Sequence, residues 1–548
     1  MREAAGNERA RLRGGGDRAL LLLVSCFLLL RLATLGVLPL FDATESRYAE
    51  IGREMAVSGN WVTPTLHGGE PFWAKPPLHF WMTALAMRIF GATEWAARLP
   101  SFLAALGTLL LTAALGRSLF GRSASLRAAV LLGSSGLFFL LAGTVLLDVT
   151  FAFATTGALG AYLLHVKEPG RRRFGLLVFF FLALGLLAKG PVAAALVLLA
   201  IGADAAFRRS ARALRALPWL PGIGILLLVA GPWYLLAERA TPGFLRYFFI
   251  HEHWLRYLHK EYGDLYGHGH VSPYGLVWGL AFLAFLPWTP ALFGAARGAL
   301  RRRGSGAGDP AGTCLWIAAL APLVFFTFSR SLSLPYVLPS LPFLALLLAR
   351  EEAEGRGAVP RRSLLLAPVL FLGGVIFTFQ EFGVSAGAGA ALVAAAAGVF
   401  LLALGATRSK RPMARLAAGV SLVPLFLLAA SLGLPGSIAE TKSTRHLAET
   451  IAGLGADTGE TVLFHGGIPL SAEFYLRGRV ARFDPSADGT GGDVGPARDR
   501  ILVLREGRER DLPLELLERL RPAGASGRHR VYRLPARSAP EGGGEEAP

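Results

Sequence analysis

The chain has 548 residues, of which 53% are hydrophobic and 17% charged, and its formal net charge is +18. Soluble domains carry about 25% charged residues, so this composition excludes an ordinary soluble enzyme. The positive charge lies mostly in short loops between apolar runs, which indicates membrane topology and contact with anionic membrane lipids rather than nucleic acid.

Clusters of Lys and Arg occur at every second boundary between apolar runs. The first cluster, Arg9 to Arg18, precedes the first apolar run. The later clusters lie within residues 117–127, 167–173, 208–215, 301–303, 350–362 and 408–415. Because cytoplasmic loops are enriched in Lys and Arg, the pattern predicts a cytoplasmic N-terminus and places the intervening loops outside.

A membrane-spanning helix needs about 20 predominantly apolar residues. The sequence predicts a polytopic α-helical membrane protein with about thirteen such helices, within a transmembrane unit at residues 1–436. The predicted spans are residues 19–38, 96–116, 127–147, 149–166, 174–188, 191–207, 217–236, 273–293, 312–329, 335–349, 363–380, 386–406 and 414–434. The first is interpreted as a retained signal anchor, and the odd count places the C-terminus outside.

Three segments are too polar to cross a membrane. Two are predicted outer loops, at about 39–95 and 237–272. The third, 437–536, is predicted to be a small soluble α/β domain outside the membrane, and the tail at 537–548 is predicted to be disordered. In the third segment we expect strands at 461–465, 501–504 and 531–534, and helices at 443–454 and 514–520.

The first outer loop carries two neighbouring carboxylates, Asp42 and Glu45. Their i,i+3 spacing places them on one face of a helix, where either could take a proton from an acceptor hydroxyl. The same spacing is typical of a helix start of the capping-box type. Both interpretations stay open on spacing alone.

Three further charged residues interrupt apolar or rigid segments on the predicted outer side. Lys75 precedes Pro76 and Pro77, which hold the backbone extended, and a fixed cation there suits a lipid phosphate. Asp148 and Lys189 each break a long apolar stretch, and ionisable groups at such depth tend to be functional. The alternatives are snorkelling lysines and an interfacial Asp that caps the following helix.

The second outer loop is rich in histidine. His251 and His253 are weak candidates for metal ligands, and further histidines stand at 259, 268 and 270. Their spacing matches no known zinc pattern, so an interfacial loop with incidental histidines is the favoured interpretation.

An ordered set of short motifs resembles one enzyme group. The motifs are Asp42 to Ile51, Lys75-Pro76-Pro77-Leu78, Arg98-Leu99-Pro100, Lys189-Gly190-Pro191, Phe285 to Trp288 and Leu334 to Pro339. Together they resemble the GT-C membrane glycosyltransferases of the bacterial aminoarabinose-transferase and protein O-mannosyltransferase-like group. That group has about thirteen spans and an outer C-terminal α/β domain, as the hydropathy and charge of this chain predict.

The resemblance implies transfer of a sugar, with inversion, from a polyprenyl-phosphate donor at the outer face of the bacterial inner membrane. The acceptor would be a lipid, a protein or a glycan. By resemblance, the base falls at Asp42 or Glu45, of which we favour Asp42, and Asp148 is a second acid. The lipid phosphate would be bound by cationic and tyrosyl side chains, namely Lys75, Arg47, Lys189, Arg256 and Tyr336.

The sequence departs from the group at three positions. Thr44 stands where the group commonly has Asp, and Ser333 stands where it commonly has Lys. Ala74 replaces a Glu implicated in metal binding, which argues against a divalent metal and leaves the cofactor unknown. A transporter or flippase, and an inactive scaffold that binds polyprenyl phosphate, are the alternative functions.

Overall fold

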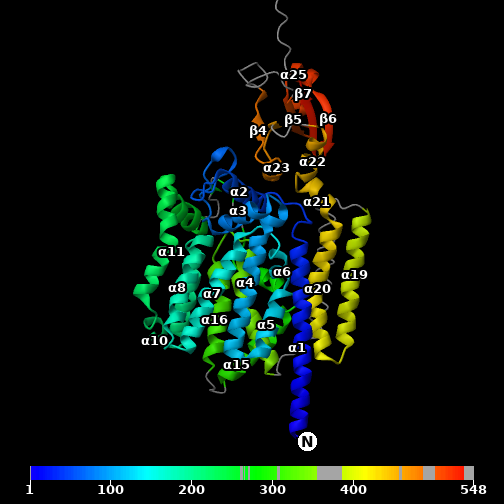
Figure 1. Cartoon of the computed structure of the whole chain (residues 1–548). Coiled ribbons are helices and arrows are strands. Elements are labelled where there is room, and N and C mark those ends of the chain that lie inside the picture. Colours follow the sequence, from blue (N-terminus) through cyan, green and yellow to red (C-terminus); the bar gives the residue numbers. More distant parts are fainter. Residues whose placement is uncertain are drawn as a thin grey trace, which may run out of the picture.

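A computed structural model describes residues 2–258, 263–264, 266–268, 272–304, 309–354, 364, 386–455, 460–485 and 500–535. Long helices stand side by side in one bundle, and a small sheet lies beyond one end of it (Figure 1). The N-terminus, the short helix α10 (Arg212–Arg215) and helix α15 (Thr289–Gly304) lie toward the other end of the bundle.

Within the described residues, seven helices are long and apolar enough to cross a membrane. They are α4 (Glu94–Phe120), α7 (Leu147–Lys167), α11 (Trp219–Ala240), α16 (Pro310–Thr327), the combined η3 and α17 span (Leu334–Glu352), α19 (Ala386–Arg408) and α20 (Pro412–Gly433). The polytopic helical fold is thus confirmed. The count of thirteen stays a prediction, and the predicted span 363–380 lies outside the described residues apart from 364.

Other helices complete the bundle. They are α1 (Arg2–Ala33), which is apolar only in its second half, α8 (Arg172–Lys189) and α9 (Val192–Phe207). Helices α14 (Leu276–Ala284) and α15 are bent by 108° relative to each other, and they make an eighth span if the bent pair is counted as one. The bend falls where Pro287 interrupts the chain, and a proline cannot donate the backbone hydrogen bond that a continuous helix needs.

The predicted span 127–147 is not one continuous helix. The chain instead forms α5 (Arg122–Gly133) and α6 (Gly136–Leu141), which are separated by Ser134 and Ser135. Both serine hydroxyls donate to carbonyls of the preceding turn, at 2.6 Å to Val130 and 2.8 Å to Leu132. Side-chain bonds of this kind compete with a continuing helix.

The two predicted outer loops form a layer over one end of the bundle. The first contains α2 (Thr44–Ser58), the short η1 (His67–Gly69) and α3 (Leu78–Phe90). The second contains α12 (Phe244–Arg246), the π-helix η2 (Tyr247–Leu255) and α13 (Arg256–Leu258), then the two-stranded β1 (Gly263–Asp264) and β2 (Gly267–His268). Buried Ile51 and Phe80 belong to the apolar core of this layer.

The C-terminal unit is a five-stranded sheet of order β4-β3-β5-β7-β6. Its strands are β3 (Val462–His465), β4 (Val480–Phe483), β5 (Arg500–Arg505), β6 (Arg521–Ser526) and β7 (His529–Leu534). Its helices are α21 (Pro435–Thr441), α22 (Arg445–Gly453), α23 (Leu470–Tyr475), η4 (Arg508–Asp511) and α25 (Leu514–Arg519). Strands β3, β4 and β5 are parallel, and β7 is antiparallel to β5.

The predicted small C-terminal α/β unit is confirmed, although the sequence indicated only part of it. Strands β3, β5 and β7 match the predicted ones, whereas β4, β6 and α23 were missed. Strand β6 contains Pro522 and Gly524, which disfavour a strand interior and suit its place at the sheet edge.

Helix α23 of this unit packs on α2 of the first outer loop, and Glu473 is buried in that contact. Its Oε2 atom has no hydrogen-bond partner among the described residues. Burial, and then repulsion from Glu50, raise the pKa of Glu473 from 4.5 to about 7, although Arg53 opposes the shift.

We expect Glu473→Gln to raise the melting temperature of the protein at pH 8. Between about pH 4.5 and 7 the folded protein keeps a proton on Glu473 that the unfolded chain releases, so stability falls as pH rises through this window. The melting temperature of the variant should therefore change less between pH 4.5 and 8 than that of the wild type. Glu518→Gln, on an exposed position of α25, is the matched control and should follow the wild type.

Candidate functional site

A cavity of about 470 Å³ lies where α8 and α9 meet the second outer loop. We call it the lysine cavity. Its polar lining consists of Lys75, Lys189, Glu252, His253, Arg256, Tyr257, Ser329, Ser331 and Tyr336. The remaining wall is largely apolar and includes Phe249, Trp254, Phe325 and Phe326. Four of the five residues that the sequence assigned to lipid phosphate thus line one cavity.

The fifth predicted residue, Arg47, is not part of the lining. It lies on α2, and its Nη1 atom is 3.5 Å from the carbonyl oxygen of Tyr266. Arg47 therefore contacts the tip of the second outer loop.

Glu252 links two cations of the lysine cavity. Its carboxylate pairs with the Lys75 ammonium and accepts two bonds from Arg256 Nη1, at 2.9 and 3.0 Å. Burial alone would raise the pKa of Glu252, but the charges of Lys75 and Arg256 hold this pKa below its usual value. Glu252 is not among the predicted site residues, although its i,i+4 spacing from Arg256 on a helix is a usable signal.

Lys189 pairs with Asp148 at the ends of two bundle helices. Lys189 is the last residue of α8, and Asp148 lies in the first turn of α7. The Lys189 ammonium also lies 4.0 Å from the centre of the Tyr336 ring, a cation–π contact. Next to it, Gly190 has φ +77, and a Cβ there would come within 2.5 Å of Phe248 Cζ. The turn after Lys189 therefore requires glycine.

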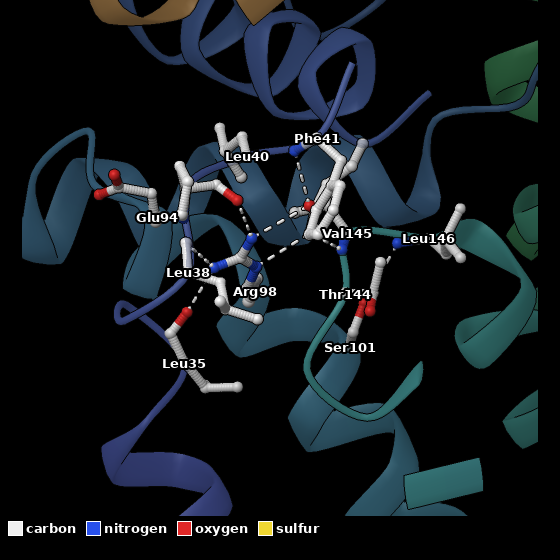
Figure 2. Close-up of polar contacts among 12 residues, drawn as sticks. Leu35, Leu38, Leu40, Phe41, Glu94, Arg98, Ser101, Thr144, Val145 and Leu146 are labelled. Carbon is white, nitrogen blue, oxygen red and sulfur yellow. Dashed lines mark hydrogen bonds and ion pairs between the residues drawn. The ribbon is translucent and has the colours of Figure 1, made fainter. Parts of the chain in front are cut away.

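Glu45 is held away from the lysine cavity by Arg98 of α4. Arg98 Nε and Nη2 donate to its two oxygens at 2.9 and 3.0 Å, and the backbone amides of Phe41 and Val145 donate at 3.1 and 3.0 Å. Burial opposes ionisation, but Arg98 and these bonds lower the pKa of Glu45. Figure 2 shows that Arg98 also reaches the carbonyls of the segment before α2.

The contacts of Glu45 are those of a structural ion pair. Its side chain and that of Arg98 are each 4% exposed, and its two oxygens accept all four bonds described above. Arg98 stands in one of the sequence motifs, but its contact with Glu45, 53 residues away, was not predicted. No local spacing signals such a pair.

Asp42 lies at the C-terminal unit. Its Oδ1 accepts from the Ser471 amide and its Oδ2 from the Ser471 hydroxyl, both at 2.7 Å. Burial raises the pKa of Asp42 despite these bonds. The residue before α2 is Ala43, and no side chain caps the helix there, so the capping-box interpretation is wrong.

The two histidines that the sequence singled out make other contacts. The ring nitrogens of His253 lie 2.7 Å from the Phe248 carbonyl oxygen and 3.3 Å from that of Lys189. The His251 ring stacks on Tyr247. Across the described part of the chain, no group of three or more His, Cys, Asp or Glu residues is arranged to hold a metal ion.

Known proteins resemble this chain in sequence and in fold. The family described as dolichyl-phosphate-mannose-protein mannosyltransferase matches residues 18–248. A protein of Sodalis glossinidius named undecaprenyl phosphate-alpha-4-amino-4-deoxy-L-arabinose arabinosyl transferase 1 is 32% identical over 340 residues, which are 61% of this chain and 58% of that protein. A transferase of the same name, without the numeral, from Pseudomonas paraeruginosa is 33% identical over 338 residues, 61% of this chain and 59% of that protein.

The matched region thus spans less than two thirds of these relatives. The crystal structure of ArnT from Cupriavidus metallidurans bound to undecaprenyl phosphate superposes with a TM-score of 0.77 at 23% identity, covering 94% of this chain and 98% of that one. These matches confirm the resemblance to the GT-C aminoarabinose-transferase group and the polytopic membrane fold with a small C-terminal sheet.

Proposed function

We propose that this protein is a glycosyltransferase of the bacterial inner membrane that uses a polyprenyl-phosphate sugar as donor. The observation that carries the proposal is the lysine cavity, which gathers Lys75, Lys189 and Arg256 around one space. The relatives named above are transferases of an undecaprenyl-phosphate sugar, and the ArnT crystal structure holds undecaprenyl phosphate.

The cavity has the chemistry that a polyprenyl phosphate requires. A phosphate can replace the carboxylate of Glu252 as partner of Lys75 and Arg256, because both cations already point at one anion. The aromatic wall, which includes Trp254 and Phe325, offers an apolar surface to the isoprenoid chain. Preorganised cations that face a developing negative charge usually contribute a large part of the stabilisation of the transition state.

The proposed reaction is a single displacement with inversion. A carboxylate removes the proton of the acceptor hydroxyl, and the oxygen forms a bond to the anomeric carbon. The bond from that carbon to the phosphate oxygen breaks, and the polyprenyl phosphate leaves with the electron pair. Lys75, Lys189 and Arg256 stabilise the negative charge that develops on the leaving phosphate.

We assign the base to Asp148. It contacts a cation of the lysine cavity directly, whereas Glu45 is bound by Arg98 and Asp42 by Ser471. Glu252 is less suited to accept a proton, because it is shared by two cations and is buried. The motif-based assignment to Asp42 or Glu45 stays the competing hypothesis.

The proposal is tested in proteoliposomes that contain the purified protein, a polyprenyl-phosphate sugar and a hydroxyl-bearing lipid, peptide or glycan. Mass spectrometry should show the acceptor gaining one sugar residue and the donor becoming free polyprenyl phosphate. A transporter would move the donor across the bilayer without cleaving it, and an inactive scaffold would bind it without product. Either result would refute sugar transfer.

The same proposal includes a topology with a cytoplasmic N-terminus and an exoplasmic C-terminal unit. We expect a reporter fused after Arg303 to be cytoplasmic and a reporter fused after Ser437 to be exoplasmic, because Arg301 to Arg303 form a positively charged cluster. Alkaline phosphatase and green fluorescent protein fusions measure the two sides. Both reporters on one side would contradict the predicted orientation.

A further inference from the structure

A second cavity, of about 320 Å³, lies in the C-terminal unit. We call it the domain cavity. His465 ends β3, Arg505 ends β5, and the register pairs Arg505 with His529, the first residue of β7. All three line the cavity, which therefore lies beyond the carboxyl ends of the parallel strands. In open α/β sheets this is the edge at which ligands bind.

The first outer loop completes the wall of this cavity. Asp42, near the start of that loop, lines it together with Glu440 to Thr444, which run from the end of α21 to the start of α22. The Asp42 amide donates to the Lys442 carbonyl at 2.9 Å. A Cβ at Gly527, in the turn between β6 and β7, would collide with the Glu440 carbonyl oxygen, so this turn packs tightly on that segment.

The domain cavity is positively charged. Its cations are Lys442, Arg505, Arg508 and Arg528, and its acids are Asp42 and Glu440. Asp42 is already bound by Ser471, and Arg508 pairs with Asp511 at 2.9 Å. The structure shows no ion pair for Arg505 or Arg528 with any residue that it describes, so both guanidinium groups are available to an anion.

Two buried polar atoms of the same wall lack partners. Ser443 is 7% exposed, and its Oγ atom has no hydrogen-bond partner in the described chain; the same holds for the buried Nδ1 of His465. Buried polar atoms in native proteins nearly always have partners. Next to them, Gly466 and Gly467 leave open space where a Cβ would stand, so a ligand can approach their backbone.

We propose that the domain cavity binds a phosphomonoester group. Arg505 and Arg528 supply the planar donors that match phosphate oxygens, and Ser443 and His465 supply the buried polar atoms that need a partner. The group could come from a lipid head group or from a soluble phosphorylated molecule. The assignment does not depend on the proposed sugar transfer, because it rests on residues outside the lysine cavity.

The test uses the full chain in phosphatidylcholine nanodiscs and measures its melting temperature. One arm adds inorganic phosphate or glycerol 3-phosphate, and a second arm includes phosphatidic acid in the nanodisc. We expect stabilisation in at least one arm, which identifies a soluble or a lipid source. The double variant Arg505→Gln/Arg528→Gln should require about 10-fold or more ligand for the same shift, since charge-assisted bonds are lost.

Three variants make the test specific. Arg521 lies at the end of β6 that is away from the domain cavity, so the Arg521→Gln variant should respond to ligand as the wild type does. Ser443→Ala removes a hydroxyl that has no hydrogen-bond partner among the described residues, so it should weaken binding without lowering the melting temperature of the free protein. Repeating the measurements in a Lys75→Ala background weakens any phosphate binding in the lysine cavity, so the response that remains there reports on the domain cavity. No stabilisation in either arm, or an undiminished response in the arginine double variant, would overturn the proposal.

Discussion

Lys75→Ala is expected to lower the rate of sugar transfer by about 100-fold or more, the usual cost of removing one preorganised donor from a developing charge. Lys75 lies in the lysine cavity beside Glu252, on a segment stiffened by two prolines. The protein should stay folded, because Glu252 keeps its bonds to Arg256. Transfer rates and undecaprenyl-phosphate binding in proteoliposomes measure the effect.

Two further variants sharpen this prediction. Lys410→Ala removes an exposed lysine between α19 and α20 and should transfer at the wild-type rate. Lys75→Arg should recover little activity, because a planar guanidinium does not replace a compact ammonium that contacts one carboxylate oxygen. Wild-type transfer by Lys75→Ala would exclude Lys75 from phosphate binding.

The bundle was largely predictable because apolar run length and loop charge are local properties of the sequence. Helices α4, α7, α11, α16, α19 and α20 match predicted spans to within a few residues. The break in the helix predicted at 127–147 has a local cause too, since the paired serines 134 and 135 end α5 inside an apolar run. Hydropathy averages over such a pair and cannot detect the break.

The C-terminal unit shows a different limit. Strands β3 and β5 are continuous apolar runs and are easy to recognise. Strand β6 is held by its pairing with β7, in spite of a sequence that disfavours strands. Its formation depends on a tertiary contact, which propensity alone does not describe.

The cations of the site were predictable, whereas the distribution of the acids was not. Lys75, Lys189 and Arg256 stand at recognisable breaks or in polar loops, and the bundle brings them together. The positions of the Asp42 and Glu45 carboxylates are set by their hydrogen bonds to Ser471 and Arg98. These partners lie 429 and 53 residues away in the chain. The i,i+3 spacing predicted one helical face for these two acids, but Asp42 precedes α2 and the two carboxylates have different partners.

Asp148→Asn is expected to reduce transfer by about 100- to 10,000-fold, the range in which a general base contributes. The amide keeps the shape of the side chain and an oxygen that can accept from Lys189, so the fold should persist. Donor binding should stay equal or become tighter, because the charge of Lys189 is no longer neutralised. Transfer kinetics measured together with donor affinity should therefore show a loss of kcat without a rise in KM.

The competing acids provide the controls for this assignment. Asp42→Asn should keep most activity, because an amide can still bond the Ser471 hydroxyl and amide. Glu45→Gln weakens a buried ion pair with Arg98, so its effect should appear first as a lower melting temperature. If Asp148→Asn transfers normally while a stably folded Asp42→Asn variant is inactive, the base lies at the C-terminal unit. The motif-based assignment would then be correct, and the lysine cavity would serve only to bind the donor.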